Sequence, residues 1–347
     1  MNNKWIKKIF KLPPKKRIIA YLITLLAFFV FVWIFYVRIH NRSYKGKLPP
    51  LTENENLLMY SIKKDVEKLA GDFSERNLSN EPALSAAANF IFDSLSLKGF
   101  KLRRQEYKVE GIMCCNIEAE IKGGEKSDEI VIIGAHYDSK FGTPGAVDNA
   151  SGAAAVIALA KMFEGEKPAR TLRFVEFVNE EPPYFQTEHM GSLRYAKQCR
   201  QRGEKIVAMI NLDMVGFFKG QKNNQKYPFP FSIFYPSVGN FIAFVSNIQS
   251  GSLLSETIKS FRQYSKFPAE GAILPEFIKG VDWSDHWSFW SQGYKAIMIT
   301  DMGFFRYPYY HQPEDTPDKI DYKRLAQIVA GLEKTIRDFV YISQANN

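Results

Sequence analysis

Cysteine is scarce in this chain of 347 residues, which contains three cysteines. Three cysteines do not make a disulfide framework, and the spacing of Cys114, Cys115 and Cys199 fits no zinc-finger pattern. Internal repeats, low-complexity segments and sustained heptads are also absent, so a solenoid or a coiled coil is not expected. With 46% hydrophobic and 24% charged residues, the composition is that of a globular protein.

Acidic residues are missing from the first 47 positions, which carry eleven Lys and Arg. This segment accounts for the net charge of +9, because the rest of the chain has 35 basic and 37 acidic residues. A nearly neutral body has no phosphate-binding character, so we do not expect a nucleic-acid partner. The sequence specifies no oligomeric state.

One long run without charges covers residues 18–37, IIAYLITLLAFFVFVWIFYV. Twenty helical residues span about 30 Å, the thickness of a bilayer core. We predict a basic cytoplasmic segment at 1–17, a single transmembrane helix at 18–37 in the cell membrane, a stalk at 38–52 and an extracytoplasmic body at 53–347. A cleaved signal peptide is disfavoured because the run is too long and no small-residue cleavage site follows.

The apolar run IVIIGA at 130–135 has the length and branched residues of a strand that is buried on both faces. His136 and Asp138 follow it directly, and Asp148 precedes a run of small residues, ASGAAAVIALA, that predicts a tightly packed helix. Ligands of open α/β sheets bind where a strand has ended and the next helix has yet to begin. These three side chains are therefore candidate site residues.

Two later apolar runs repeat this pattern. Residues 171–178 lead into Glu180 and Glu181, and residues 206–212 lead into Asp213. Helical patterns separate the runs, as a parallel sheet requires. Parallel neighbours would bring all of these side chains to one edge of the sheet.

The fold class that we predict is α/β, a helix/sheet/helix sandwich around a mixed, centrally parallel sheet. Apolar spacing predicts helices at 53–71, 83–99 and 322–342. Residues 103–124 alternate and contain a glycine, which predicts a hairpin or edge strands.

A histidine among several carboxylates in a partly buried cleft is costly unless the charges are compensated, and a divalent metal ion would compensate them. A metal would favour a second imidazole. Of the five histidines, His40 falls in the stalk, which leaves His189, His286 and His311 besides His136. His311 lies in a Pro-rich loop after another apolar run, KAIMIT, and so also follows the end of a strand.

The ordered motifs of the chain are HYD, AVDNASG, NEE, NLDMVG, SDHWSF and YYHQPEDTPD. In this order they resemble the co-catalytic di-zinc aminopeptidases typified by bacterial leucyl aminopeptidase. Glutamate carboxypeptidase II and the glutaminyl cyclases are more distant relatives of that family. The resemblance covers roughly residues 55–340.

The resemblance implies two zinc ions, with Asp148 as a bridge between them. One ion would also bind His136 and Asp213. The other would bind Glu181 and His311. Zinc takes His and carboxylate ligands, and a carboxylate with two oxygens suits a bridging position.

Proton transfer and ligand orientation are assigned by the same resemblance. Glu180 would be the general base, and Asp138 would orient His136 by accepting a hydrogen bond from its other ring nitrogen. In that family the SDH motif supports the site without binding metal. The resemblance therefore favours His311 over His286 as the second histidine ligand of zinc. His189 is interpreted as an exposed or capping residue, and Glu188 as a weak candidate for binding a substrate's α-ammonium group.

These assignments predict a metal-dependent exopeptidase, an aminopeptidase acting on peptides, with residues 217–280 as an aromatic insertion that forms a substrate wall. A glutaminyl-peptide cyclase using one zinc ion is an alternative, as is a non-catalytic receptor ectodomain. A carboxypeptidase or dipeptidase is a third, but it would need a cationic cluster to bind the substrate carboxylate. The basic residues of the wall are scattered: Lys219, Lys222, Lys226, Lys259 and Arg262.

Overall fold

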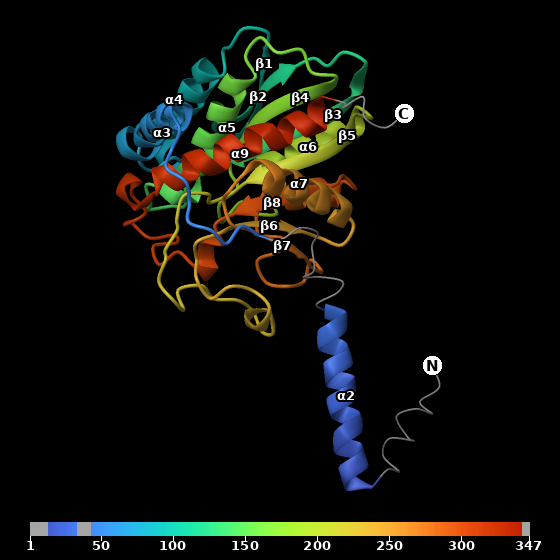
Figure 1. Ribbon diagram of the computed structural model, residues 1–347. Helices are drawn as coiled ribbons and strands as arrows, with labels where there is room; N and C mark the ends of the chain where they lie inside the picture. The colour runs from blue at the N-terminus through green and yellow to red at the C-terminus, as the bar shows by residue number, and fades with distance from the viewer. Residues whose placement is uncertain (1–12, 33–42, 342–347) are drawn as a thin grey trace.

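The computed structural model describes residues 13–32 and 43–341 of the chain (Figure 1). The strands are β1 (Lys101–Val109), β2 (Ile112–Ile121), β3 (Lys126–His136), β4 (Arg170–Phe177), β5 (Lys205–Leu212), β6 (Ile242–Ser246), β7 (Ala269–Ile273) and β8 (Ala296–Thr300). The main helices are α2 (Pro14–Val32), α3 (Glu53–Val66), α4 (Glu81–Ser94), α5 (Ser151–Met162), α6 (Gly191–Gln201), α7 (Gly251–Tyr264), α8 (His286–Ser291) and α9 (Tyr322–Val340).

All eight strands form one mixed sheet in the order β1-β2-β4-β3-β5-β8-β6-β7. The central neighbours β4, β3, β5 and β8 run parallel, whereas β1, β2 and β6 make antiparallel pairs. The prediction of a mixed, centrally parallel sheet is confirmed. Because β4, β3 and β5 are parallel neighbours, their carboxyl ends lie at the same edge.

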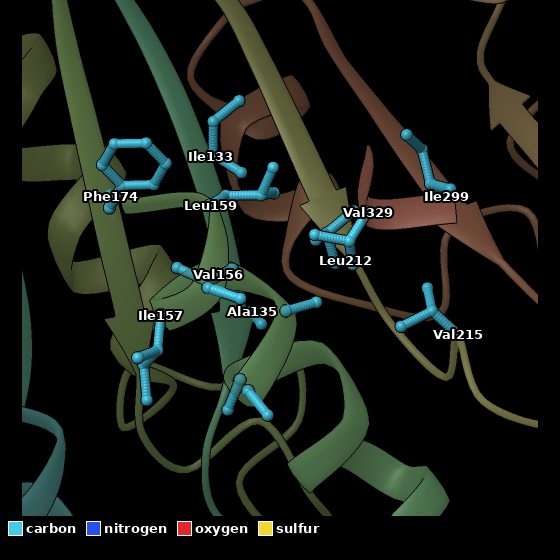
Figure 2. Packing of buried hydrophobic residues seen from close by; sticks show 14 of the residues in the cluster. Ile133, Ala135, Val156, Ile157, Leu159, Phe174, Leu212, Val215, Ile299 and Val329 are labelled. Atoms are coloured by element: carbon cyan, nitrogen blue, oxygen red, sulfur yellow. The ribbon is translucent and has the colours of Figure 1, made fainter. Parts of the chain in front are cut away.

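Helices cover both faces of the sheet, and the side chains of the strands alternate between two apolar cores. In β3, Val131 and Ile133 face the larger core, which includes residues of α3, α4, α5, α7 and α9. Ile130 and Ile132 face the smaller core, shared with α6 and α8. Figure 2 shows Leu159 of α5 where that helix packs on β3 and β4 in the larger core.

Local sequence explains where the first helix of the body begins. Thr52 and Glu55 form a capping box, in which each side chain binds the backbone N–H of the other residue. The predicted helix at 53–71 is α-helical to Val66 and continues as a π-helical turn to Asp72. The predicted helix at 83–99 is α4, which ends earlier, at Ser94.

The alternating segment at 103–124 is a hairpin of β1 and β2. Glu110 and Gly111 connect the strands, both with positive φ, which matches the right-handed twist of paired strands. The C-terminal helix begins at Tyr322 as predicted and ends at Val340, earlier than the predicted residue 342, because Tyr341 is already extended.

Helix α2 overlaps the predicted transmembrane helix at 18–37, but residues 33–37 lie outside the described part of the chain. Among the residues that the structure describes, no helix is both long enough and apolar enough to span a bilayer.

Candidate metal centre

The strand ends bring the predicted site residues together at one edge of the sheet. His136 is the last residue of β3, Glu180 and Glu181 follow β4, and Asp213 directly follows β5. Each is largely buried. His311 reaches the same place from the loop that follows β8.

Asp148 lies between the two histidines. Its Oδ1 is 3.5 Å from Nε2 of His136, and its Oδ2 is 3.2 Å from Nε2 of His311. His311 Nε2 is also 3.1 Å from Oε2 of Glu181, while His136 Nε2 is 3.8 Å from Oδ1 of Asp213. Each oxygen of Asp148 therefore faces a different histidine.

The backbone around Asp148 is held by Asn149. Its Nδ2 donates to the carbonyl of Leu212, and its Oδ1 accepts from the backbone N–H groups of Gly152 and Met214. A Cβ at Gly152 would lie 2.3 Å from Oδ1 of Asn149 and 2.5 Å from the Leu212 carbonyl, so only glycine fits there. This explains the small residues of the AVDNASG motif.

Asp138 has a wider role than the one predicted. Its Oδ1 and Oδ2 accept the backbone N–H groups of Glu180 and Glu181, at 3.1 and 3.2 Å. Nδ1 of His136 is 3.3 Å from the backbone carbonyl of Asp138 and 3.5 Å from its Oδ1. Asp138 therefore fixes the paired glutamates as well as facing the histidine ring.

Unusual backbone conformations occur at three positions of the site. Asn179, Met214 and His311 have φ values of 60°, 54° and 58°, in the left-handed region that non-glycine residues seldom adopt. Asn179 precedes Glu180, and Met214 follows Asp213. Such conformations persist only where the surrounding structure enforces them, and they cluster at functional sites.

Burial and close packing of charges shift the pKa values in the cluster. Burial raises the pKa of Glu180 well above its usual value, and burial together with Asp148 raises the pKa of Glu181 to about 7. Burial alone would lower the pKa of His311, but hydrogen bonds to Asp148 and Glu181 raise it to about 10. Burial opposes ionisation of Asp148, yet its close contacts with the imidazoles of His136 and His311 lower its pKa.

The donor atoms fit metal ions. His136, Glu180 and Asp213 offer one group of ligand atoms within 4.8 Å of one another, and Asp148, Glu181 and His311 offer a second. Within the described residues, the buried Nε2 of His136 and Oε1 of Glu181 have no hydrogen-bond partner. Buried polar atoms without partners are costly, and His nitrogens with carboxylate oxygens are the ligands that zinc takes.

Arg76 was not identified from the sequence, although it supports the site. Its guanidinium is fully buried and donates to five backbone carbonyls, among them those of Tyr137, Pro144 and Gly145. These hydrogen bonds join the end of β3 to the loop that carries Asp148. The residue lies in a polar loop without periodicity, so no pattern in the sequence indicated its role.

Asp315 also supports the loop that carries Asp148, and it belongs to a motif quoted above without a role. Its carboxylate accepts the backbone N–H groups of Val147 and Asp148 and the hydroxyl of Tyr307. The loop after β8 is thereby fixed to the loop after β3. The separation of these segments in the sequence, 167 residues from Asp148 to Asp315, concealed the contact.

The remaining histidines of the body lie outside both ligand groups. His286 is fully buried, its Nε2 is 2.7 Å from the carbonyl of Val281, and burial lowers its pKa to about 4. His189 packs edge-on against Tyr184 and is half-buried. Asp285 occupies the position before α8, but its side chain does not cap the helix. Burial raises the pKa of this carboxyl to about 7.

An apolar pocket opens beside the ligand groups. Asp148, Glu180, Asp213 and His311 lie at one end of it. Its walls are the faces of β6, β7 and β8 and the aromatic loops around them, with these residues: Tyr227, Phe231, Tyr235, Phe241, Ala243, Val245, Ala272, Leu274, Met298, Trp283 and Phe304.

Charged groups are few along this pocket. Besides the ligand groups, its charged lining residues are Glu270 and Lys279. The pocket is not lined by the basic residues considered above for a carboxypeptidase: Lys219, Lys222, Lys226, Lys259 and Arg262. Glu188, the weak candidate for binding an α-ammonium group, is exposed and is not part of the lining.

Comparison with known proteins places the chain in a family. The model of peptidase family M28 matches residues 116–336. YfbL of Escherichia coli K12, described as uncharacterized, is 32% identical over 326 residues, which cover 91% of this chain and 97% of YfbL. A probable zinc metalloprotease of Pyrenophora tritici-repentis is 37% identical over 113 residues, or 30% of this chain and 25% of that protein.

Solved structures share the fold. A zinc aminopeptidase from Bacillus subtilis aligns with a TM-score of 0.64 at 15% identity, covering 87% of this chain and 98% of that one. A glutaminyl cyclase from Fimbriiglobus ruber aligns with a TM-score of 0.58 at 19% identity, covering 85% and 97%. The match of the family model and the similarity to YfbL over nearly the full length of both proteins show that the chain belongs to peptidase family M28.

Proposed function

We propose that this chain is a zinc-dependent aminopeptidase that hydrolyses the N-terminal bond of peptides. The observation that carries the proposal is the position of Asp148, whose two oxygens face His136 and His311 separately. One carboxylate between two ligand groups suits a pair of ions. Relatives described as a probable zinc metalloprotease and a probable leucine aminopeptidase agree with this assignment.

The ligand sets would be those implied by the motifs. His136 and Asp213 would hold one zinc ion, Glu181 and His311 the other, and Asp148 would bridge them. When bound, zinc supplies Lewis acidity and activates water at neutral pH.

Glu180 would act as the general base. Its backbone N–H donates to Asp138, which positions the residue, and its buried carboxylate lies beside the ligand groups, with Oε2 3.8 Å from Nε2 of His136. It would accept the proton of the attacking water and return it to the leaving amine. The apolar pocket beside it would hold the side chain of the residue that is removed.

A peptide library tests this function. The full chain in detergent is incubated with mixed peptides, and released N-terminal residues are identified by mass spectrometry. We expect release that stops with a metal chelator and in Glu180→Gln. If the zinc-loaded protein released no N-terminal residue from any peptide, the aminopeptidase assignment would be refuted.

Membrane anchoring is part of the proposal. The apolar segment 18–37 would cross the cell membrane once, with the basic residues 1–17 in the cytoplasm and the body outside. In support, the large side chains of α2 from Ile18 to Leu26 are exposed and apolar. The full chain should remain in the membrane pellet after carbonate washing, and external protease should digest the body in intact cells.

A further inference from the structure

Exposed apolar side chains gather where the pocket reaches the surface. Phe229 and Ile233 lie on the loop between β5 and β6 and are 82% and 61% exposed. Phe277 and Trp283 lie in the segment between β7 and α8, Phe304 follows β8, and the three are 84%, 37% and 48% exposed. Residues one or two positions away in the chain from each of the five line the pocket, as do Trp283 and Phe304 themselves. We call these five residues the aromatic rim.

A lysine lies within the rim. Nζ of Lys279 is 5.5 Å from the ring of Trp283 and 4.6 Å from that of Phe304, and these two rings are 6.0 Å apart. No ion pair of Lys279 occurs in the described part of the chain. Aromatic rings beside an unpaired lysine are typical of surfaces at the bilayer interface, where the rings enter the headgroup layer and the ammonium meets phosphate.

The rim lies close to the apolar helix α2. The ring of Phe29 in α2 is 6.0 Å from that of Phe234, which is next to Ile233 on the rim loop. Figure 1 shows α2 extending away from the side of the body on which the loop between β5 and β6 lies. The apolar helix and the part of the rim on the loop between β5 and β6 therefore lie on the same side of the body.

We propose that the aromatic rim docks on the lipid bilayer, so that the pocket opens at the membrane surface. Exposed apolar patches on a soluble body mark interaction sites, and the adjoining helix identifies lipid as the occupant here. Lys279 and the exposed Lys226 suit anionic headgroups. Resting on the proposed peptidase function, the inference names the substrate class: peptides held at the membrane.

Depth-dependent quenching tests the docking without reference to activity. The full chain is placed in nanodiscs of phosphatidylcholine and phosphatidylglycerol and labelled with an environment-sensitive dye at Phe229→Cys or Phe277→Cys. The three native cysteines are buried, so labelling should be selective. Leu57→Cys, on an exposed position of α3, is the control.

Lipid spin-labelled near its headgroup should quench the rim dyes at least about twofold more than the dye at Leu57. Equal quenching at all positions would overturn the proposal. Energy transfer between rim dyes on two copies in detergent, without quenching by lipid, would also overturn it and would indicate self-association.

A matched pair of peptides tests the substrate class. The same leucine-initiated peptide is offered free in solution or tethered to the nanodisc by an acyl chain at its C-terminal end. The double variant Phe229→Ser, Ile233→Ser changes exposed side chains that do not line the pocket. We expect this variant to cut the tethered peptide about fivefold more slowly than wild type and the free peptide at a rate within about twofold of wild type. The control, Leu57→Ser, should cut both peptides at rates within about twofold of wild type.

If the variant cut both peptides at the wild-type rate, the substrate class would be wrong. If wild type cut neither peptide, the proposed peptidase function would fail, whereas the quenching result would still decide the docking.

Discussion

The edge of the sheet that carries the proposed metal ligands and the aromatic wall of the pocket are built in opposite ways. At the edge, polar side chains bind backbone groups, as Asp138 does with Glu180 and Glu181. Along the wall, apolar side chains such as Ala243 and Met298 pack against one another, and few polar atoms take part. Directional hydrogen bonds at the edge hold individual atoms in place, whereas apolar packing along the wall determines the shape of the pocket.

This difference separates two properties of the protein. Hydrogen bonds hold ligand atoms in one geometry, so changes at the edge should reduce metal binding or turnover for every substrate. Apolar packing discriminates by size, so changes in the wall should alter selectivity and leave the metals in place.

Replacing the general base should have the largest effect. In Glu180→Gln we expect kcat to fall about 10³-fold with zinc content unchanged, because the amide cannot accept the proton. The control, Glu181→Gln, should instead lose zinc, as measured by elemental analysis of the purified protein. Equal zinc loss in both variants would remove the division of roles between the two glutamates.

Removing the buried guanidinium should mainly destabilise the fold. Arg76→Met leaves five backbone carbonyls without this donor, three of them in buried hydrogen bonds, and we expect about 3 kcal/mol or more of lost unfolding free energy. Arg76→Lys keeps the charge but not the fork of donors and should recover part of this loss. Denaturant unfolding measures the stability of both variants. An unchanged unfolding midpoint in Arg76→Met would refute the supporting role of Arg76.

Weakening the support of the glutamates should have an intermediate effect. Asp138→Asn retains one acceptor oxygen where two backbone N–H groups now bind, so we expect zinc affinity to fall about 10- to 100-fold. Competition with a chelator of known affinity measures the change. An affinity equal to that of wild type would show that the contacts with Asp138 do not position the ligands.

Filling the wall should give the smallest effect and the most selective one. Ala243→Leu narrows the pocket between β6 and the loop that carries Phe231. Hydrolysis of leucine-initiated peptides should slow about tenfold in kcat/KM, with alanine-initiated peptides nearly unaffected. Ile248→Phe, a similar increase in size at an exposed position, is the control. An equal loss for both peptides would mean that the wall does not select the side chain.

The two regions also differ in what the sequence could predict. The strand-end residues were placed at one edge because strongly apolar runs stop at His136, before Glu180 and at Asp213, and parallel strands end together. The ordered motifs identified Asp148 and His311 as well. Arg76 and the contacts of Asp315 were missed because they depend on loops brought together by the whole fold.

The wall could be predicted only in outline. Composition indicated an aromatic segment at 217–280, but the sequence did not show which rings face the pocket and which face outward. Phe231 is buried in the lining while Phe229, two residues earlier, is 82% exposed. Irregular loops have no period from which such a difference could be read.

The most direct test of the central claim is anomalous diffraction at the zinc edge from crystals of the zinc-loaded protein. The account predicts two peaks about 3.5–4 Å apart. One should lie beside His136 and Asp213, the other beside Glu181 and His311, with an oxygen of Asp148 bound to each. A single peak, or two peaks that do not share Asp148, would contradict it.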